Sequence, residues 1–294
     1  MPGARATGRL IGALLLLCGL SSGAAPAAEP EAVRLATLKF GTVAWALDSM
    51  LHHGDDRAAG IRLELRALAG TDATRIALQS GDADVIAGDW VWVSRQRAAG
   101  QDLSFVAFST GVGALMVPAG SAVRAIPDLA GRRLGIAGGP LDKSWLFLQA
   151  VARKRHGLVL TAAVEQVFGA PPLLSELLRP GRIDAVLPYW HYAARLRAAG
   201  FESVLAVEDL IADLGGVRDM PVIGFIFREA WARAHPAAAA GFIAALRRAQ
   251  GRLLADDREW PRLRPLLRAE GEAQFLALRD GFRADIPAGT AAAV

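Results

Sequence analysis

The chain has 294 residues, of which 53% are hydrophobic and 21% charged, and its formal net charge is +4. This length suits two ordinary domains or one large one, and the composition is typical of a globular protein and excludes a disordered one. Basic residues are scattered and form no stripe, so the sequence argues against nucleic acid as a partner.

The first 27 residues have the three parts of a secretory signal peptide. Arg5 and Arg9 form a basic region, residues 10–20 form a short apolar region, and a zone of small residues follows. The apolar region is too short to span a bilayer. We therefore expect cleavage after Ala27 and a periplasmic mature protein, with an uncleaved membrane anchor as the alternative.

In chain order, the next part alternates between apolar strands and amphipathic helices. The strands are expected at residues 33–38, 61–68, 82–88 and 103–110. The helices are expected at residues 43–53, 73–81 and 89–100. Because each helix follows closely after a strand, this order predicts a mainly parallel sheet that is covered by helices on both faces.

A second unit repeats the alternation. Its strands are expected at residues 113–118, 132–138, 162–168, 183–188 and 201–207. Its helices are expected at residues 141–156, 171–181 and 189–200. We interpret residues 208–221 as a loop, residues 222–227 as one more apolar strand and the remainder as helices.

The two units predict an α/β protein of two lobes, each a mainly parallel sheet flanked by helices. The chain is expected to cross between them near residues 109–113 and again near residues 206–221. The predicted ranges are a signal peptide at 1–27, a first lobe at 28–112, a second lobe at 113–206 and a return to the first lobe at 207–294. A lobe that is left and re-entered leaves a cleft that can hinge open and closed.

Little in the sequence supports catalysis. The only cysteine, Cys18, lies in the signal segment, and the five histidines show no spacing of a metal site. Beyond that segment, neither a nucleophile elbow nor a nucleotide-binding glycine motif occurs. We expect no catalytic residue, no metal and no cofactor. An enzyme would need acid–base chemistry from Asp184, Tyr189 and His191.

Ligand binding is better supported, because open α/β sheets bind ligands at the carboxyl ends of their strands. Four of the seven tryptophans lie at such ends, and Trp45, Trp90, Trp145 and Trp190 are expected as flat walls of a cleft. The alternative is that some of these rings plug the seam between helix and sheet. The other residues predicted to bind the ligand are Thr42, Asp89, Ser109, Lys143, Ser144 and Tyr189.

The stretch G-G-P-L-D-K-S-W at residues 138–145 joins a predicted strand to a predicted helix. Its two glycines allow a tight turn and a close approach of the backbone to a ligand. Either Asp142 or Ser144 is expected to cap the helix. The helix N-terminus and Lys143 favour an anion, whereas Asp142 brings a negative charge to the same place, so the charge of the ligand stays open.

Four segments resemble one known family. They are residues 66–90, with "GDADV", residues 126–158, with "DLAGRRLGI", residues 177–200, with "GRIDA", and residues 227–257. In these segments the chain resembles the periplasmic solute-binding proteins of ABC importers, of the nitrate/sulfonate/taurine and pyrimidine-precursor type. The segments cover most of residues 33–260.

The resemblance implies a type II periplasmic-binding-protein fold that closes on a small organic solute and docks on an ABC permease of the inner membrane. It also implies a monomer that acts without nucleic acid and without catalysis. Two alternatives remain: a periplasmic enzyme on the same fold, and a sensor or protein-binding module.

Overall fold

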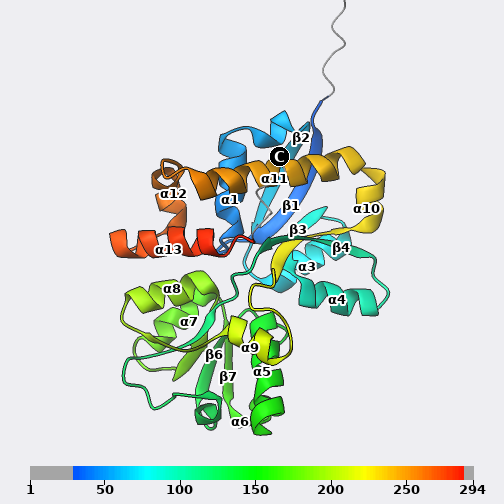
Figure 1. Ribbon diagram of the computed structural model, residues 1–294. Helices are drawn as coiled ribbons and strands as arrows, with labels where there is room; N and C mark the ends of the chain where they lie inside the picture. The colour runs from blue at the N-terminus through cyan, green and yellow to red at the C-terminus, as the bar shows by residue number, and fades with distance from the viewer. Residues whose placement is uncertain (1–28, 288–294) are drawn as a thin grey trace, which may run out of the picture.

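The computed structural model describes residues 29–287, so the predicted signal peptide lies outside the described residues. Two five-stranded sheets, each flanked by helices, form two lobes that lie one above the other in Figure 1. This arrangement confirms the predicted two-lobed α/β fold. Within the described residues, no helix has both the length and the hydrophobicity to cross a membrane.

The first lobe holds a sheet with the strand order β2-β1-β3-β10-β4. Its strands are β1 (Glu31–Leu38), β2 (Ile61–Leu68), β3 (Val85–Asp89), β4 (Leu103–Ser109) and β10 (Ile223–Arg228). Its helices are α1 (Val43–His52), α2 (Asp55–Ala58), α3 (Thr71–Ser80), α4 (Trp90–Ala98), α10 (Glu229–Ala234), α11 (Pro236–Ala255), α12 (Glu259–Leu267) and α13 (Glu272–Ala284).

Both faces of the first sheet are covered. One apolar cluster joins the sheet to α1 and to the C-terminal helices α11 to α13, and a smaller one joins it to α3 and α4. Alternate residues of β1 therefore serve different clusters: Val33 and Leu35 contact the first, whereas Ala36 contacts the second. Because both faces are buried, these strands read as nearly continuous apolar runs.

The second lobe holds a sheet with the strand order β7-β6-β8-β5-β9. Its strands are β5 (Ala114–Val117), β6 (Arg133–Ala137), β7 (Glu165–Gly169), β8 (Ala185–Leu187) and β9 (Glu202–Ala206). Its helices are the 3-10 turn η1 (Ile126–Leu129), α5 (Lys143–His156), α6 (Leu160–Ala163), α7 (Pro171–Leu178), α8 (Trp190–Ala198) and α9 (Val207–Asp213).

One strand in each sheet runs against the others. In the first sheet β10 is antiparallel to β3 and β4, and in the second β5 is antiparallel to β8 and β9. The pairing of β10 with β4 shifts register at Gly224. A Cβ at this position would lie 2.3 Å from the carbonyl oxygen of Val106. Glycine is therefore required at this irregularity.

The chain passes from the first lobe to the second between β4 and β5. There Thr110 donates its backbone N–H and its hydroxyl to the carbonyl oxygen of Asp285, at 2.8 and 3.1 Å, which ties the end of α13 to the crossover. Gly113 has a φ of +129°, and a Cβ on it would lie 2.3 Å from the carbonyl oxygen of Pro188. The crossover is thus held tightly against the start of α8.

Residues 208–221, expected to be a loop, begin with the helix α9, which is a correction to the sequence prediction. Val207, Leu210 and Ile211 have the spacing of one helix face, and they pack with α5 in the second lobe's core. The chain joins the first sheet only at Ile223. We therefore propose that the second lobe extends through α9, beyond the predicted boundary at residue 206.

Candidate functional site

A cavity of about 90 Å³, which we name the inner chamber, lies where the carboxyl ends of the two sheets face each other. Its lining comprises Thr37, Leu38, Gly41, Thr42, Val43, Thr71, Ala87, Gly88, Asp89, Ser109, Gly111, Val112, Asp142, Lys143, Tyr189, Trp190, His191 and Ile223. Both lobes therefore contribute walls.

A second cavity of about 240 Å³, the outer chamber, adjoins the first and shares Leu38, Thr71, Asp142 and Tyr189 with it. Further walls of the outer chamber come from the start of α3, the start of α7 and the glycine pair before α5. Gly138 has a φ of +88°, and a Cβ on it would lie 3.0 Å from the hydroxyl of Tyr189. The backbone at Gly138, which follows β6, therefore lies close against Tyr189, and the predicted close approach to a ligand stays a prediction.

Asp89 stands at the end of β3 and caps α4. Its carboxylate accepts the backbone N–H of Trp92 at 2.8 Å and a guanidinium N–H of Arg75 at 3.3 Å. The Arg75 guanidinium also lies 5.3 Å from the ring of Trp92, and both charged side chains are buried. Asp89 is therefore held rigidly and carries its own counter-charge.

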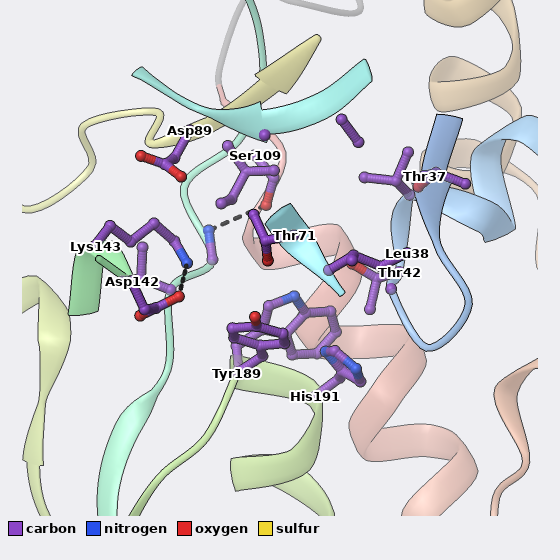
Figure 2. A pocket seen from close by; sticks show the side chains of 18 residues that line it. Thr37, Leu38, Thr42, Thr71, Asp89, Ser109, Asp142, Lys143, Tyr189 and His191 are labelled. Atoms are coloured by element: carbon purple, nitrogen blue, oxygen red, sulfur yellow. Dashed lines mark hydrogen bonds and ion pairs between the residues drawn. The ribbon is translucent and has the colours of Figure 1, made fainter. Parts of the chain in front are cut away.

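Asp142 and Lys143 begin α5 and face the chamber side by side (Figure 2). The Asp142 carboxylate accepts the backbone N–H of Ser144 at 2.9 Å, and the Lys143 ammonium lies 3.7 Å from the same carboxylate. Burial raises the pKa of Asp142, Lys143 opposes this shift and Asp89 adds to it. The Lys143 ammonium also lies 5.0 Å from the ring centre of Tyr189.

Tyr189 and His191 form the wall at the start of α8 (Figure 2). Burial and the neighbouring Asp142 raise the pKa of Tyr189, so its phenol stays protonated and can donate a hydrogen bond. The Nε2 atom of His191 lies 2.8 Å from the carbonyl oxygen of Phe40, which belongs to the other lobe. This bond joins the two lobes at the edge of the chamber.

Six of the residues that the sequence predicts as ligand-binding line the inner chamber together. They are Thr42, Asp89, Ser109, Lys143, Tyr189 and Trp190. Part of the hydrogen-bonding capacity of Ser109 is already used, because its hydroxyl accepts the backbone N–H of Gly111 at 3.0 Å. The chamber therefore gathers polar groups from β1, β3, β4, α5 and α8 around one small volume.

The other four predicted residues do not line the chamber, which corrects the picture of four tryptophan walls. Trp145 is 1% exposed in the second lobe's core, and Trp45 packs edge-on against Trp260 in the first lobe's core. Trp90 packs against the second lobe's core, and Ser144 is buried beneath α5. Helix phase explains the two buried rings: Trp45 and Trp145 lie on the helix faces that pack into their own lobe's core, and the strand ends alone do not fix that direction.

Several lining residues were not predicted to bind a ligand. Thr37, Leu38 and Val43 bracket the predicted Thr42, and Thr71 starts α3 at the same edge of the sheet. Their position after a strand or before a helix was the available signal. In the sequence argument Asp142 appeared as a helix cap and as a negative charge near the ligand, and His191 appeared only in the enzyme alternative. Both line the chamber.

The three residues that the enzyme alternative requires do not lie together. Asp184 precedes β8 and binds Arg133, accepting its backbone N–H at 2.8 Å, whereas Tyr189 and His191 follow the other end of β8. The three residues therefore lie at opposite ends of one strand. Within residues 29–287, no three His, Cys, Asp or Glu side chains are grouped in a way that could hold a metal ion.

Comparison with known proteins gives a family and a fold. The family described as NMT1/THI5 like matches residues 57–259, which is most of the chain. The alkanesulfonate-binding protein SsuA from Xanthomonas axonopodis pv. citri, bound to MOPS, is 20% identical with a TM-score of 0.69, covering 88% of this chain and 86% of that one. No curated protein matches the chain.

Two further solved structures have the same fold. The periplasmic aliphatic sulphonate-binding protein SsuA from Escherichia coli is 18% identical with a TM-score of 0.68, covering 90% of this chain and 89% of its own. A protein from Bordetella bronchiseptica RB50 is 21% identical with a TM-score of 0.68, covering 90% and 82%. The chain has the two-lobed fold of periplasmic binding proteins. It belongs to the NMT1/THI5-like family, as the four resembling segments predicted.

Proposed function

We propose that this chain is a periplasmic substrate-binding protein, which captures one small organic solute between its lobes and delivers it to an ABC-type import permease. The observation that carries the proposal is the composition of the inner chamber. Thr42 and Ser109 come from the first lobe, and Lys143 and Tyr189 come from the second. A solute that contacts both lobes stabilises their closed arrangement, and closure is a state that a permease can recognise.

The comparisons support the proposal at the level of the class. The chain belongs to a family that matches most of its length, and the structures that share its fold include periplasmic proteins that bind sulfonates. We further propose that the predicted signal peptide directs export. Because one chain supplies both walls of the chamber, we propose a monomer as the working unit. We also propose that nucleic acid is not a partner.

The residues proposed to contact the solute are Thr42, Asp89, Ser109, Lys143, Tyr189 and Trp190. Hydroxyls supply both donors and acceptors, and Trp190 supplies a flat apolar face. The function requires no chemical change in the solute, since none of these groups is arranged as a nucleophile with its base.

Native mass spectrometry of protein purified from the periplasm tests the proposal. We expect one small molecule per chain, released unchanged on denaturation and rebound with a stoichiometry of one. Thr42→Val, which removes only a lining hydroxyl, is expected to weaken rebinding about tenfold, the effect of one lost hydrogen bond. The matched control is Thr161→Val, at an exposed position of helix α6, which should leave rebinding unchanged. Protein without any bound or rebinding small molecule would refute the proposal.

A further inference from the structure

His191 is the one chamber-lining histidine, and its hydrogen bonding is half complete. The carbonyl oxygen of Phe40 can only accept, so the Nε2 atom that lies 2.8 Å from it carries the proton. Its other ring nitrogen, Nδ1, is buried and has no hydrogen-bond partner among the described residues. His191 as a whole is 3% exposed and lines the inner chamber.

The ring is held in its neutral form. Burial, together with the positive charges of Arg195 and Lys143, lowers the pKa of His191 to about 3, against the raising effect of the hydrogen bond to the Phe40 carbonyl. Near neutral pH, Nδ1 is therefore a lone-pair acceptor. A buried acceptor without a partner is costly, so a ligand that brings a donor to it gains binding free energy.

The charges around the chamber point to the ligand's net charge. Each lining carboxylate has a cation beside it: Asp89 lies 3.3 Å from Arg75, which also pairs with Asp72, and Asp142 lies 3.7 Å from Lys143. The chamber thus offers no uncompensated positive charge among the described residues that line it. Burying a simple anion beside two carboxylates would leave that anion without a full counter-charge.

Lys143 adds a second requirement. Its ammonium is buried, with 5% of the residue exposed, and it lies 3.7 Å from the Asp142 carboxylate and 5.0 Å from the ring centre of Tyr189. These contacts leave donor capacity for an acceptor atom on a ligand, since an ammonium has three N–H donors. Lys143 therefore favours a hydrogen-bond acceptor on the ligand, whereas His191 favours a hydrogen-bond donor.

We infer that the solute is a small electroneutral molecule, uncharged or zwitterionic, that donates an N–H or O–H hydrogen bond to Nδ1 of His191 and offers an acceptor to Lys143. This inference rests on the proposed function and narrows it. It makes His191 a specificity-determining residue, and it excludes simple monoanions without a donor, such as nitrate or methanesulfonate, as the preferred solute.

Matched probes test the inference on the wild-type protein by isothermal titration. Glycine, benzamide and 2-pyrrolidone carry N–H donors, whereas trimethylglycine, N,N-dimethylbenzamide and N-methyl-2-pyrrolidone are their counterparts without one. Nitrate, methanesulfonate and benzenesulfonate are the anionic arm. We expect the molecule recovered from the purified protein, and any binding probe, to belong to the donor class. Methylation of the donor should weaken binding about ten- to a hundredfold.

Two variants separate the nitrogens of His191. In His191→Gln the amide nitrogen can keep the bond to Phe40 while the Nδ1 acceptor is lost. In His191→Asn the amide oxygen can replace that acceptor while the bond to Phe40 is lost. We expect His191→Gln to weaken the binding of a donor-bearing probe about tenfold and to leave the affinity for its methylated counterpart unchanged. We expect His191→Asn to keep more of the affinity, and circular dichroism checks that each variant is folded.

The possible outcomes test this inference separately from the proposed function on which it rests. Tight binding of a donor-free monoanion, or equal binding of a probe and its methylated counterpart, would overturn the inference and leave the proposed function standing. Water as the only occupant, with no probe or recovered molecule binding, would overturn both. The wild-type arm decides the matter even where a variant does not fold.

Discussion

Replacing Trp145 tests whether this residue stabilises the core or binds the ligand. Its indole is 1% exposed and packs in the second lobe with Leu148 and Val151 of the same helix. A buried tryptophan removes about 150–250 Å² from water, worth about 4–6 kcal/mol at about 25 cal/mol per Å². Trp145→Ala should therefore lower the free energy of unfolding by about 3–5 kcal/mol, the usual cost of such a truncation.

The assay pairs thermal unfolding with titration of the recovered ligand. At about 2–4 °C for each kcal/mol, the melting temperature should fall by about 10 °C, while ligand affinity of the folded variant stays within about twofold. Trp190→Ala is the matched comparison, because Trp190 lines the chamber, and it should lose affinity at least about tenfold. A Trp145→Ala variant that keeps its melting temperature but loses binding would refute this assignment.

Three further changes probe the cap, the crossover and a buried carboxyl. Asp142→Asn and Asp142→Ala both leave the buried Lys143 ammonium without its counter-charge, so both should lose stability in urea unfolding. Because asparagine also caps helices, Asp142→Asn should lose about 1 kcal/mol less than Asp142→Ala. Gly113→Ala should cost more than about 2 kcal/mol, because φ is +129° and Pro188 blocks the Cβ. Burial and then Glu208 raise the pKa of Asp285 from 3.8 to about 7. The folded chain therefore holds this proton more tightly than the unfolded chain, and its stability should fall as the pH rises from about 4 to about 7, by up to about 4 kcal/mol. Asp285→Asn should flatten that slope in unfolding curves taken across the range.

Each of these expectations has a definite contrary result. Equal losses in Asp142→Asn and Asp142→Ala would show that the carboxylate charge matters more than the cap. A Gly113→Ala variant as stable as wild type would mean that the crossover relaxes away from α8. An unchanged pH slope in Asp285→Asn would assign the slope to another buried acid.

The alternation of strands and helices was readable from the sequence because each strand is an apolar run and each helix shows its own period. The reversed direction of β5 and β10 within these mainly parallel sheets was not, because it depends on pairing between distant segments. The strand β10 lies antiparallel between β3 and β4 only because the chain re-enters the first lobe from the second. Helix α9 carried a signal in the spacing of Val207, Leu210 and Ile211, but it is short and runs directly into a glycine-rich turn.

Strand ends located the chamber, but they did not determine which side chains face it. In α5, Trp145 shares its helix face with Leu148 and Val151, and that spacing placed its ring toward the core. The acceptor on His191 had no sequence signal, because it depends on the Phe40 carbonyl, 151 positions away in the chain. Residue type and local position indicated a site, and only tertiary contacts showed which atoms are free to bind.

Hydrogen exchange with mass spectrometry, with and without the recovered ligand, tests the central claim that one solute is held between the lobes. We predict slower exchange in the segments that line the chamber from both lobes, namely residues 37–43, 109–112, 142–143 and 189–191. Helix α6, which lies outside the chamber lining, serves as an internal reference whose exchange should not change. Protection confined to one lobe, or to surfaces away from these segments, would contradict the account.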